Sequence, residues 1–172
     1  MSNFISVKLD NPSRTYLPGS NVTGKVYVFL AKPKKVRNIT LFAAGRAKTT
    51  FDYQSVLPCG FEKTFFEYFF VLWKPTNGEN EVIPAGKYYF EFSFKIPSDC
   101  LPNFEGQFGN IQYSIKAKMD IPLQLNLKSE QHFNIESILP STIINKIVKQ
   151  HFTDQFSASE VINVEVSFYF DF

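Results

Sequence analysis

The sequence predicts an all-β fold, a two-sheet antiparallel β-sandwich with one short helix near the C-terminus. The first supporting observation is alternation, because apolar side chains occupy every second position over residues 85–97 and again over 111–121. A period of two places one set of side chains in a core and the other in water, which is typical of antiparallel sheets with one wet face. The inward positions are Tyr88, Phe90, Phe92, Phe94 and Ile96 in the first segment, and Ile111, Tyr113, Ile115, Ala117, Met119 and Ile121 in the second.

The second observation is the composition of the chain. Its 172 residues are 44% hydrophobic and include 20 Phe and 8 Tyr. Aromatic side chains at this density favour pleated, half-buried surfaces, and the length suits one domain with a substantial core. The net charge of +2 provides no whole-protein field that would recruit nucleic acid or anionic lipid.

The first strands are separated by turn residues. A strand over 5–9 stops at Asp10-Asn11-Pro12-Ser13. A tight turn is expected at Pro18-Gly19, because Pro presets φ at the first corner and Gly supplies the positive φ of a type II turn. Further strands are expected over 22–30 and 39–47, where apolar and polar residues alternate.

The middle of the chain continues the series of strands. Residues 64–73 are apolar on both faces, which predicts a central strand covered on each side, and residues 74–80 form a flexible connection to the two strands described first. Pro122 tends to mark an edge or a bulge, and residues 123–127 alternate after it as a further strand. Short strands at regular spacing, without a long helical pattern, indicate a sandwich or a barrel.

The C-terminal part departs from this pattern. Apolar residues recur at helical spacing after Pro140, which suits an early helix position, and they predict a short amphipathic helix over about 140–151. Residues 161–172 then alternate as a strand that no later strand can pair with. We expect this strand either to fold back on its own sandwich or to pair with another chain. The apolar positions of the predicted helix are Ile143, Ile144, Ile147 and Val148.

Several segments resemble the N-terminal domain of the arrestin family, and most nearly that of the α-arrestins, the arrestin-domain-containing proteins. Their order and spacing together are specific, and the resemblance covers roughly Phe4 to Ile135. The segments are Tyr16-Leu17-Pro18-Gly19-Ser20-Asn21-Val22-Thr23-Gly24-Lys25-Val26, residues 36–45, Ile83-Pro84-Ala85-Gly86, residues 90–97, Leu101-Pro102-Asn103-Phe104-Glu105-Gly106 and residues 111–118.

This resemblance implies an immunoglobulin-like sandwich, like the arrestin N-domain, over residues 1–136, which acts as a non-enzymatic trafficking adaptor. Such proteins bind membrane receptors or transporters and link them to endocytic machinery or ubiquitin ligases. α-Arrestins also carry a second sandwich and a tail with Pro-Pro-x-Tyr motifs, and this sequence contains neither, so ligase recruitment through such a motif is not supported. Residues 137–172, the short helix and the last strand, resemble a remnant of the start of that second domain.

The expected compartment is the cytoplasm. The N-terminus has neither a basic start nor a continuous apolar segment, and no stretch approaches the ~20 apolar residues that span a bilayer. Cys59 and Cys100 are too few for a disulfide framework. The resemblance adds the plasma membrane or endosomes as places of action, with peripheral membrane association.

The sequence offers little that suggests catalysis. His132 and His151, together with the two cysteines, lack metal-ligand spacing. The sequence contains no glycine-rich phosphate loop, Gly-x-Ser-x-Gly elbow or His-Glu-x-x-His motif. We therefore expect no enzymatic activity, no metal and no cofactor. Nothing in the spacing brings together the carboxylates that could form a pair, which are Asp52, Glu62 and Glu67.

Two groups of cations are candidates for contact with an acidic or phosphorylated partner. The first group is either a solvated loop that keeps a sheet edge from pairing or a contact for anionic headgroups or a phosphorylated tail. The second group lies on one face of a single strand. The aromatic residues over 65–73 are not a candidate site, because we expect them to belong to the core. The first group is Lys32, Lys34, Lys35 and Arg37, and the second is Lys116 and Lys118.

Two other functions stay open at this point. One is a structural protein-interaction sandwich outside trafficking, and the other is a ligand-binding domain of the lectin or hydrolase kind. Association with membrane cargo would favour the adaptor, whereas binding of a sugar or turnover of a substrate would favour the last reading.

Overall fold

The computed structural model describes residues 2–51, 59–136, 149–156 and 160–167. The internal contacts divide the chain into two units, Met1–Ser137 and Ile138–Phe172. Every regular element among the described residues is a β-strand, so the predicted all-β class is confirmed. No helix long and apolar enough to span a membrane is found in that part of the chain.

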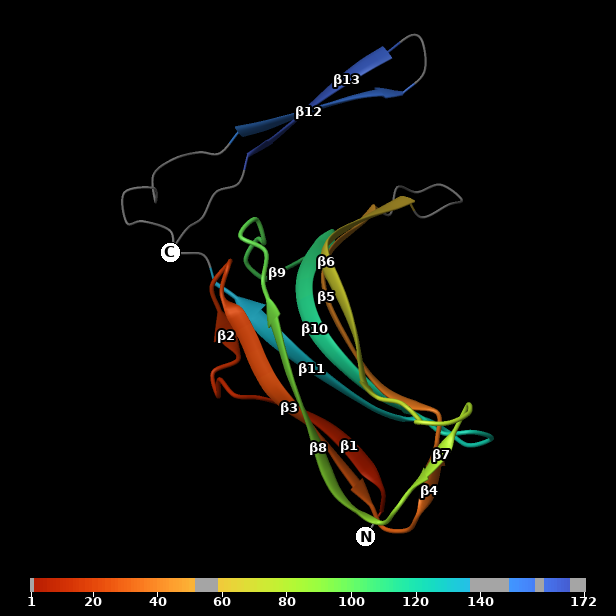
Figure 1. Cartoon of the computed structure of the whole chain (residues 1–172). Helices are drawn as coiled ribbons and strands as arrows, with labels where there is room; N and C mark the ends of the chain where they lie inside the picture. Colours follow the sequence, from red (N-terminus) through yellow and green to blue (C-terminus); the bar gives the residue numbers. More distant parts are fainter. Residues whose placement is uncertain (1, 52–58, 137–148, 157–159, 168–172) are drawn as a thin grey trace. The chain divides into compact units, whose positions relative to one another are not determined.

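Two sheets face each other in the first unit and enclose its core between them (Figure 1). The three-stranded sheet has the order β1-β3-β8, with β1 at Phe4–Leu9, β3 at Asn21–Leu30 and β8 at Gly86–Lys95. The six-stranded sheet has the order β2-β11-β10-β5-β6, and β9 also pairs with β10. Its strands are β2 (Thr15–Tyr16), β5 (Asn38–Phe51), β6 (Cys59–Trp73), β9 (Phe104–Gly106), β10 (Gly109–Asp120) and β11 (Leu127–Ile135).

Most of the strand pairs are antiparallel, as the alternation predicts. β11 and β2 form a parallel pair. A separate short antiparallel pair joins β4 (Lys34–Val36) to β7 (Glu81–Ile83).

The two strands that carried the fold prediction have the expected orientation. Along β8, Phe92 and Phe94 are buried, Tyr88 and Phe90 are half-buried, and the side chains between them are exposed. Along β10 and just after it, the predicted inward residues from Tyr113 to Ile121 are buried. The ring of Phe94 lies 6.0 Å from that of Phe66 and 6.3 Å from that of Phe133, so aromatic side chains of both sheets meet in the core.

The turn at Pro18-Gly19 is confirmed. Gly19 has φ of +80°, and the N–H of Ser20 donates to the carbonyl of Leu17 at 3.1 Å, as a type II turn requires. The turn sets the start of β3, because the carbonyl of Ser20 in turn accepts from the N–H of Ile96 at 2.9 Å.

The predicted central position of residues 64–73 is wrong. These residues belong to β6, which is the last strand of its sheet and pairs with β5 in the described part of the chain. Phe69 is 65% exposed and Val71 53% exposed, whereas Phe70 and Leu72 face the core. Apolar residues on both faces therefore reflect an apolar outer surface, which the sequence pattern cannot distinguish from a second buried face.

The predicted strand over 123–127 is also wrong. Leu123 and Leu125 are almost fully exposed, Leu123 in a turn and Leu125 in the stretch after it, and the strand begins at Leu127. Pro122 occupies the first corner of this turn, Leu123 has φ of +57°, and the N–H of Gln124 approaches the carbonyl of Ile121 at 3.4 Å. The turn geometry after the proline therefore prevails over the short apolar alternation.

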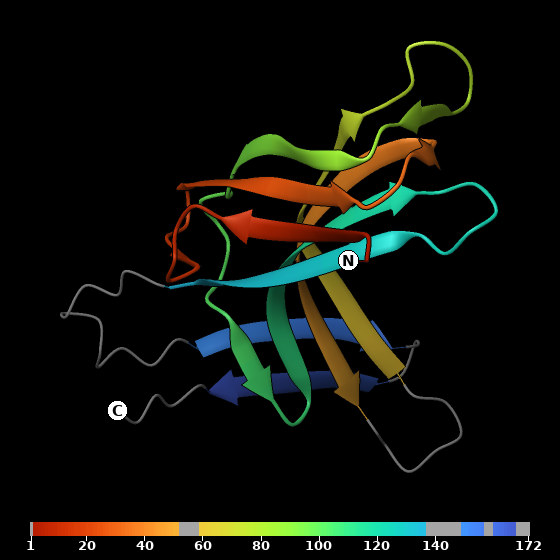
Figure 2. The same ribbon diagram turned by 90° about the horizontal axis from the view of Figure 1, so that it is seen from below.

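The two sheets are joined differently at their two sides. β11 runs beside β1 (Figure 2), and the N–H of Val7 donates to Oγ of Ser129 at 3.2 Å. At the other side an open cavity of about 650 Å³ separates β6 from β8. There Oη of Tyr68 donates to the carbonyl of Lys95 at 3.0 Å.

The second unit contains one antiparallel hairpin among its described residues. It joins β12 (Lys149–Phe156) to β13 (Glu160–Ser167). Most of the helix predicted over about 140–151 lies outside the described residues, but its last positions, 149–151, belong to β12 and are not helical. The predicted last strand is present up to residue 167, and the rest of it lies outside the described residues. We expected this strand to fold back on the sandwich or to pair with another chain; among the described residues β13 instead pairs with β12, the strand before it in the sequence.

Candidate functional site

The outer face of the six-stranded sheet gathers polar and charged side chains from strands that are far apart in the sequence. We call it the polar sheet face. β5, β6 and β10 are bent along this face, which is hollowed on the side away from the three-stranded sheet (Figure 1). A cavity of about 160 Å³ lies there. The face is made up of Phe42, Ala44, Arg46, Lys48, Glu62, Glu67, Phe69, Asn110, Gln112, Ser114, Lys116, Glu130 and His132.

The strand register explains the arrangement of charge at one end of this face. Arg46 and Lys48 are two residues apart on β5, so both side chains point outward. The guanidinium of Arg46 pairs with Glu67 and lies 3.3 Å from Glu62, and Nζ of Lys48 is 3.6 Å from the same Glu62. Two cations of β5 are thus matched by two carboxylates of β6.

A second group of charges lies on β10 and β11. Nζ of Lys116 is 3.1 Å from the carboxylate of Glu130, and Nε2 of His132 is 3.5 Å from the same group. The side chain of Gln112 donates to Glu105 at 3.1 Å. Between the two groups, Phe42 lies opposite Lys116 on one side and opposite Phe69 on the other. The face therefore presents an apolar centre flanked by paired charges.

The six cations predicted from the sequence do not form one patch. Arg37 and Lys118 meet at the carboxylate of Asp120, at 3.6 Å and 3.8 Å. Nζ of Lys34 donates to the side chain of Gln124 at 2.8 Å, and Lys116 is paired with Glu130 on the polar sheet face.

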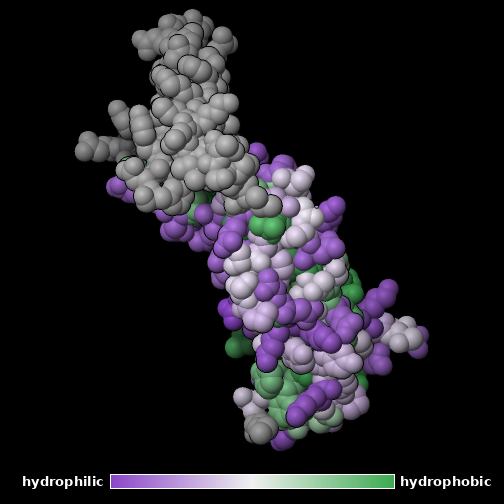
Figure 3. Space-filling view, turned by 90° about the vertical axis from the view of Figure 1, so that its left-hand side faces the viewer, coloured by the Kyte–Doolittle hydropathy of each residue, from purple (hydrophilic) through white to green (hydrophobic). Residues whose placement is uncertain are grey.

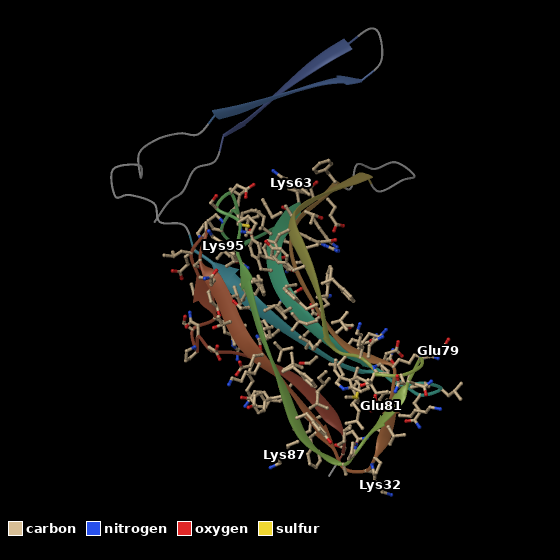
Figure 4. All side chains as sticks on the ribbon, viewed as in Figure 1. Lys32, Lys63, Glu79, Glu81, Lys87 and Lys95 are labelled. Atoms are coloured by element: carbon tan, nitrogen blue, oxygen red, sulfur yellow. The ribbon has the colours of Figure 1, made fainter. Side chains whose placement is uncertain are left out.

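The remaining two cations lie near the end of the sandwich where β3 leads into β4. Lys32 is exposed in the connection between the two strands and Lys35 is exposed on β4. Figure 4 shows Lys32 at the same end of the sandwich as Lys87 of β8.

Cys100 and Tyr113, two residues with ionisable nucleophilic groups, are held in the core. Burial is the main cause that raises the pKa of the Cys100 thiol to about 11, so this group is a neutral thiol at pH 7. Burial also raises the pKa of Tyr113, whose hydroxyl donates to the carbonyl of Leu101 at 2.6 Å. Among the described residues, no group of three or more His, Cys, Asp or Glu side chains is placed to hold a metal ion. The polar sheet face is suited to recognition through charge and shape.

Sequence reasoning missed most of this face. Arg46, Lys48 and Glu130 were not candidates, and Glu62 and Glu67 were considered only as carboxylates that nothing brings together. The structure brings both carboxylates to the guanidinium of Arg46. The available signal was the pair of cations at alternate positions of one strand, 46 and 48, followed by two acidic residues at positions 62 and 67.

Comparisons of sequence and structure show which known proteins this chain is similar to. Residues 5–142 match the family model described as Arrestin (or S-antigen), N-terminal domain. The chain is 30% identical over 143 residues to arrestin domain-containing protein 17 of Caenorhabditis elegans, a match that covers 77% of this chain and 34% of that protein. It is 29% identical over 140 residues to the thioredoxin-interacting protein of Mus musculus, covering 77% and 35%. The chain thus spans about a third of the length of these relatives.

A solved structure with the same fold is that of Spo0M, a sporulation control protein from Bacillus subtilis. The TM-score is 0.52 at 19% identity, and the match covers 80% of this chain and 49% of that one. At this identity the likeness concerns the fold alone. The family match covers most of the first unit, including both sheets and the polar sheet face. The chain therefore belongs to the arrestin family and is an α-arrestin-like protein.

Proposed function

We propose that this protein is a non-enzymatic adaptor that binds the cytoplasmic part of a membrane receptor or transporter during endocytic trafficking or protein transport. The observation that supports this most directly is the match to the arrestin N-terminal domain over residues 5–142. Members of that family are adaptors that interact with proteins, and the proposal extends this role to membrane cargo. The site of action is the cytoplasm, at the plasma membrane or at endosomes.

The polar sheet face is the surface we assign to this cargo. It combines the exposed ring of Phe69 with charges of both signs at Arg46, Glu67 and Lys116. An apolar centre with a polar rim is the usual composition of a protein-binding surface. The charges of this face are already paired within the chain. They would therefore contribute to the choice and orientation of a partner more than to the affinity for it.

Ubiquitin-ligase machinery is a further partner of the proposed adaptor. These 172 residues contain no Pro-Pro-x-Tyr motif, so the proposal assigns ligase recruitment to no such motif here. The six predicted cations fit an acidic or phosphorylated partner only where they are free of internal pairs. Lys32 and Lys35 meet that condition within the described ion pairs, whereas Arg37, Lys116 and Lys118 each contact a carboxylate of the chain.

Site-specific photo-crosslinking tests the proposal. A photoreactive phenylalanine analogue is placed at position 69, on the polar sheet face, and in a control at position 125, which is 93% exposed in the stretch before β11. Cross-linking in living cells, followed by mass spectrometry, should recover cytoplasmic segments of membrane proteins from position 69 and not from position 125. Recovery only of proteins unrelated to membranes would favour a structural interaction domain outside trafficking, and loss of capture in the presence of a sugar would favour a lectin-like binder.

A further inference from the structure

The outer face of the three-stranded sheet carries exposed aromatic rings among lysines. The register places Phe4 opposite Phe29, and Tyr27 opposite Tyr89, so the rings form two adjacent rows across the sheet. Phe4 is 50% and Tyr89 63% exposed. We call this surface the aromatic–lysine face, and it consists of Phe4, Lys8, Lys25, Tyr27, Phe29, Lys87, Tyr89, Glu91 and Lys95.

Figure 3 looks onto this side of the molecule. Hydrophobic side chains gather toward its lower end, and hydrophilic ones lie among and above them. Lys87 and Lys95 lie near the two ends of β8 (Figure 4). The cations are therefore distributed along the face and around the aromatic rows.

The face is strongly positive compared with the whole chain. Its four lysines and one glutamate leave three positive charges, whereas the entire chain has a net charge of +2. Of the four lysines, Lys25 is in an ion pair among the described residues, at 2.9 Å from Glu91. The polar sheet face differs, because Arg46, Lys48 and Lys116 there all contact carboxylates.

The lysines and rings lie against each other. Nζ of Lys8 lies 5.5 Å from the centre of the Tyr27 ring, and Nζ of Lys25 lies 5.2 Å from that of Tyr89. The rings of Phe4 and Phe29 stack on each other at 5.6 Å. The ring faces are therefore partly covered, either by a lysine amino group or by a second ring.

We propose that the aromatic–lysine face docks on a bilayer surface that contains anionic phospholipids. Lysines near such a surface are attracted to its phosphates and carboxylates. Aromatic rings with polar tips favour the headgroup level of a membrane. The middle of a sheet face also matches a flat bilayer better than a peptide, since peptides are usually bound in a groove or along a strand edge.

Single-stranded nucleic acid is the other macromolecule that basic, aromatic sheet faces bind. That mode needs free ring faces on which successive bases stack. Here Phe4 and Phe29 stack on each other, and Tyr27 and Tyr89 are each approached by a lysine. The arrangement of the rings thus favours the lipid surface.

The proposal goes beyond the adaptor function and does not depend on it. Cargo is assigned to the six-stranded sheet and lipid to the three-stranded sheet, so binding to protein-free vesicles tests the second assignment alone. The whole chain is mixed with vesicles of phosphatidylcholine, or of phosphatidylcholine with about 30% phosphatidylserine, at about 0.1 M salt, and bound protein is measured by flotation. We expect binding only to the anionic vesicles, weakened by added salt.

Matched variants locate the surface. The double variant Lys8→Glu/Lys87→Glu should weaken binding about tenfold or more, whereas Lys63→Glu/Lys128→Glu, with the same change in charge on the six-stranded sheet, should weaken it far less. Tyr89→Ser should reduce binding, whereas Phe69→Ser on β6 should not, although the two side chains are exposed to a similar extent, 63% and 65%.

Three results would overturn the proposal. These are absence of binding to the anionic vesicles, equal losses in the two double variants, and tighter binding of an unstructured RNA oligonucleotide that depends on Tyr89. Circular dichroism melts of all variants show that each is folded before its binding is compared.

Discussion

At the scale of single residues, the core depends on close contacts between glycines and aromatic rings. A Cβ at Gly24 would lie 2.5 Å from the carbonyl oxygen of Lys8 and 2.7 Å from the ring of Phe92. A Cβ at Gly45 would lie 2.4 Å from the ring of Tyr113. These glycines let large rings cross over neighbouring strands, so both members of each pair are constrained.

Removing one of these rings should be costly. Phe92→Ala should lower the free energy of unfolding by about 3–5 kcal/mol, because the ring is buried and its removal leaves a cavity. The neighbouring Ser93→Ala should change little, since Ser93 is exposed. Denaturation with urea measures both, and equal effects would mean that the side chains of β8 are assigned to the wrong faces.

The positive φ of Gly19 supports a second prediction. Gly19→Val should cost about 1–2 kcal/mol of stability, mainly through backbone strain, because a Cβ added there has only Cβ of Ser98 within 4 Å, at 3.9 Å. Asn21→Val, at an exposed strand position, is the matched control and should not destabilise the protein. Ser20→Ala is unsuitable as a control, since Oγ of Ser20 donates to the carbonyl of Leu17 at 2.7 Å. A neutral Gly19→Val in thermal melts would contradict the turn type.

Cys100 should make the protein less stable in alkali. Its pKa is raised from 9.0 to about 11 by burial, so the folded state keeps a proton that the unfolded state releases. Its contribution to stability is therefore complete below pH 9 and is lost as the pH rises toward about 11. Melting temperatures from pH 8 to 11 should fall less steeply in Cys100→Ala than in the original chain, and parallel curves would rule out this role of the thiol.

At the scale of elements, the strands follow largely from alternation, whereas their neighbours do not. A period of two shows which side chains share a face, as it does for β8 and β10, but it carries no information on which strand lies alongside. It also fails where an outer face is apolar, as at Phe69 and Val71 of β6. The strand over 127–135 was missed because only Phe133 and Ile135 of its residues are buried.

The turn before β11 supports a prediction at this scale. Leu123 has φ of +57° and is fully exposed, so its side chain brings backbone strain without burial. Leu123→Gly should raise the free energy of unfolding by up to about 1 kcal/mol. Leu125→Gly, between this turn and β11 and without positive φ, should bring no gain. Urea denaturation compares the two, and a loss of stability in Leu123→Gly would show that the leucine stabilises the turn in another way.

At the scale of the whole molecule, the two outer faces of the sandwich carry charge in different ways. The polar sheet face pairs its ions internally, whereas the aromatic–lysine face leaves most of its lysines outside the described ion pairs. The basic residues at 32–37 could be recognised from the sequence because they are near neighbours, although the ion pair of Arg37 with Asp120 could not. Arg46 and Glu62 could not, because only the pairing of β5 with β6 brings them together.

The two sides of the sandwich also imply unequal motion. Oη of Tyr68 donates to the carbonyl of Lys95 at the side where a cavity separates β6 from β8. Tyr68→Phe should speed hydrogen exchange of the β8 amides that pair with β3 near Lys95 about fivefold, the effect of losing one hydrogen bond. Tyr88→Phe is the matched control, because that hydroxyl donates to Pro84 within the same segment and does not link the sheets. Equal rates in the two variants would show that the Tyr68 bond does not hold the side closed.

The two sheets are therefore linked more firmly along one side of the sandwich than along the other. The firmer side is the one where β1 lies beside β11, and we expect the sheets to separate first between β6 and β8. A contact that moves β6 and β8 apart would displace strands across both sheets but would hardly move β1 and β11. A displacement of β8 by a bilayer, or of β6 by a cargo protein, would therefore be transmitted to the other strand through the core aromatic rings around Phe94.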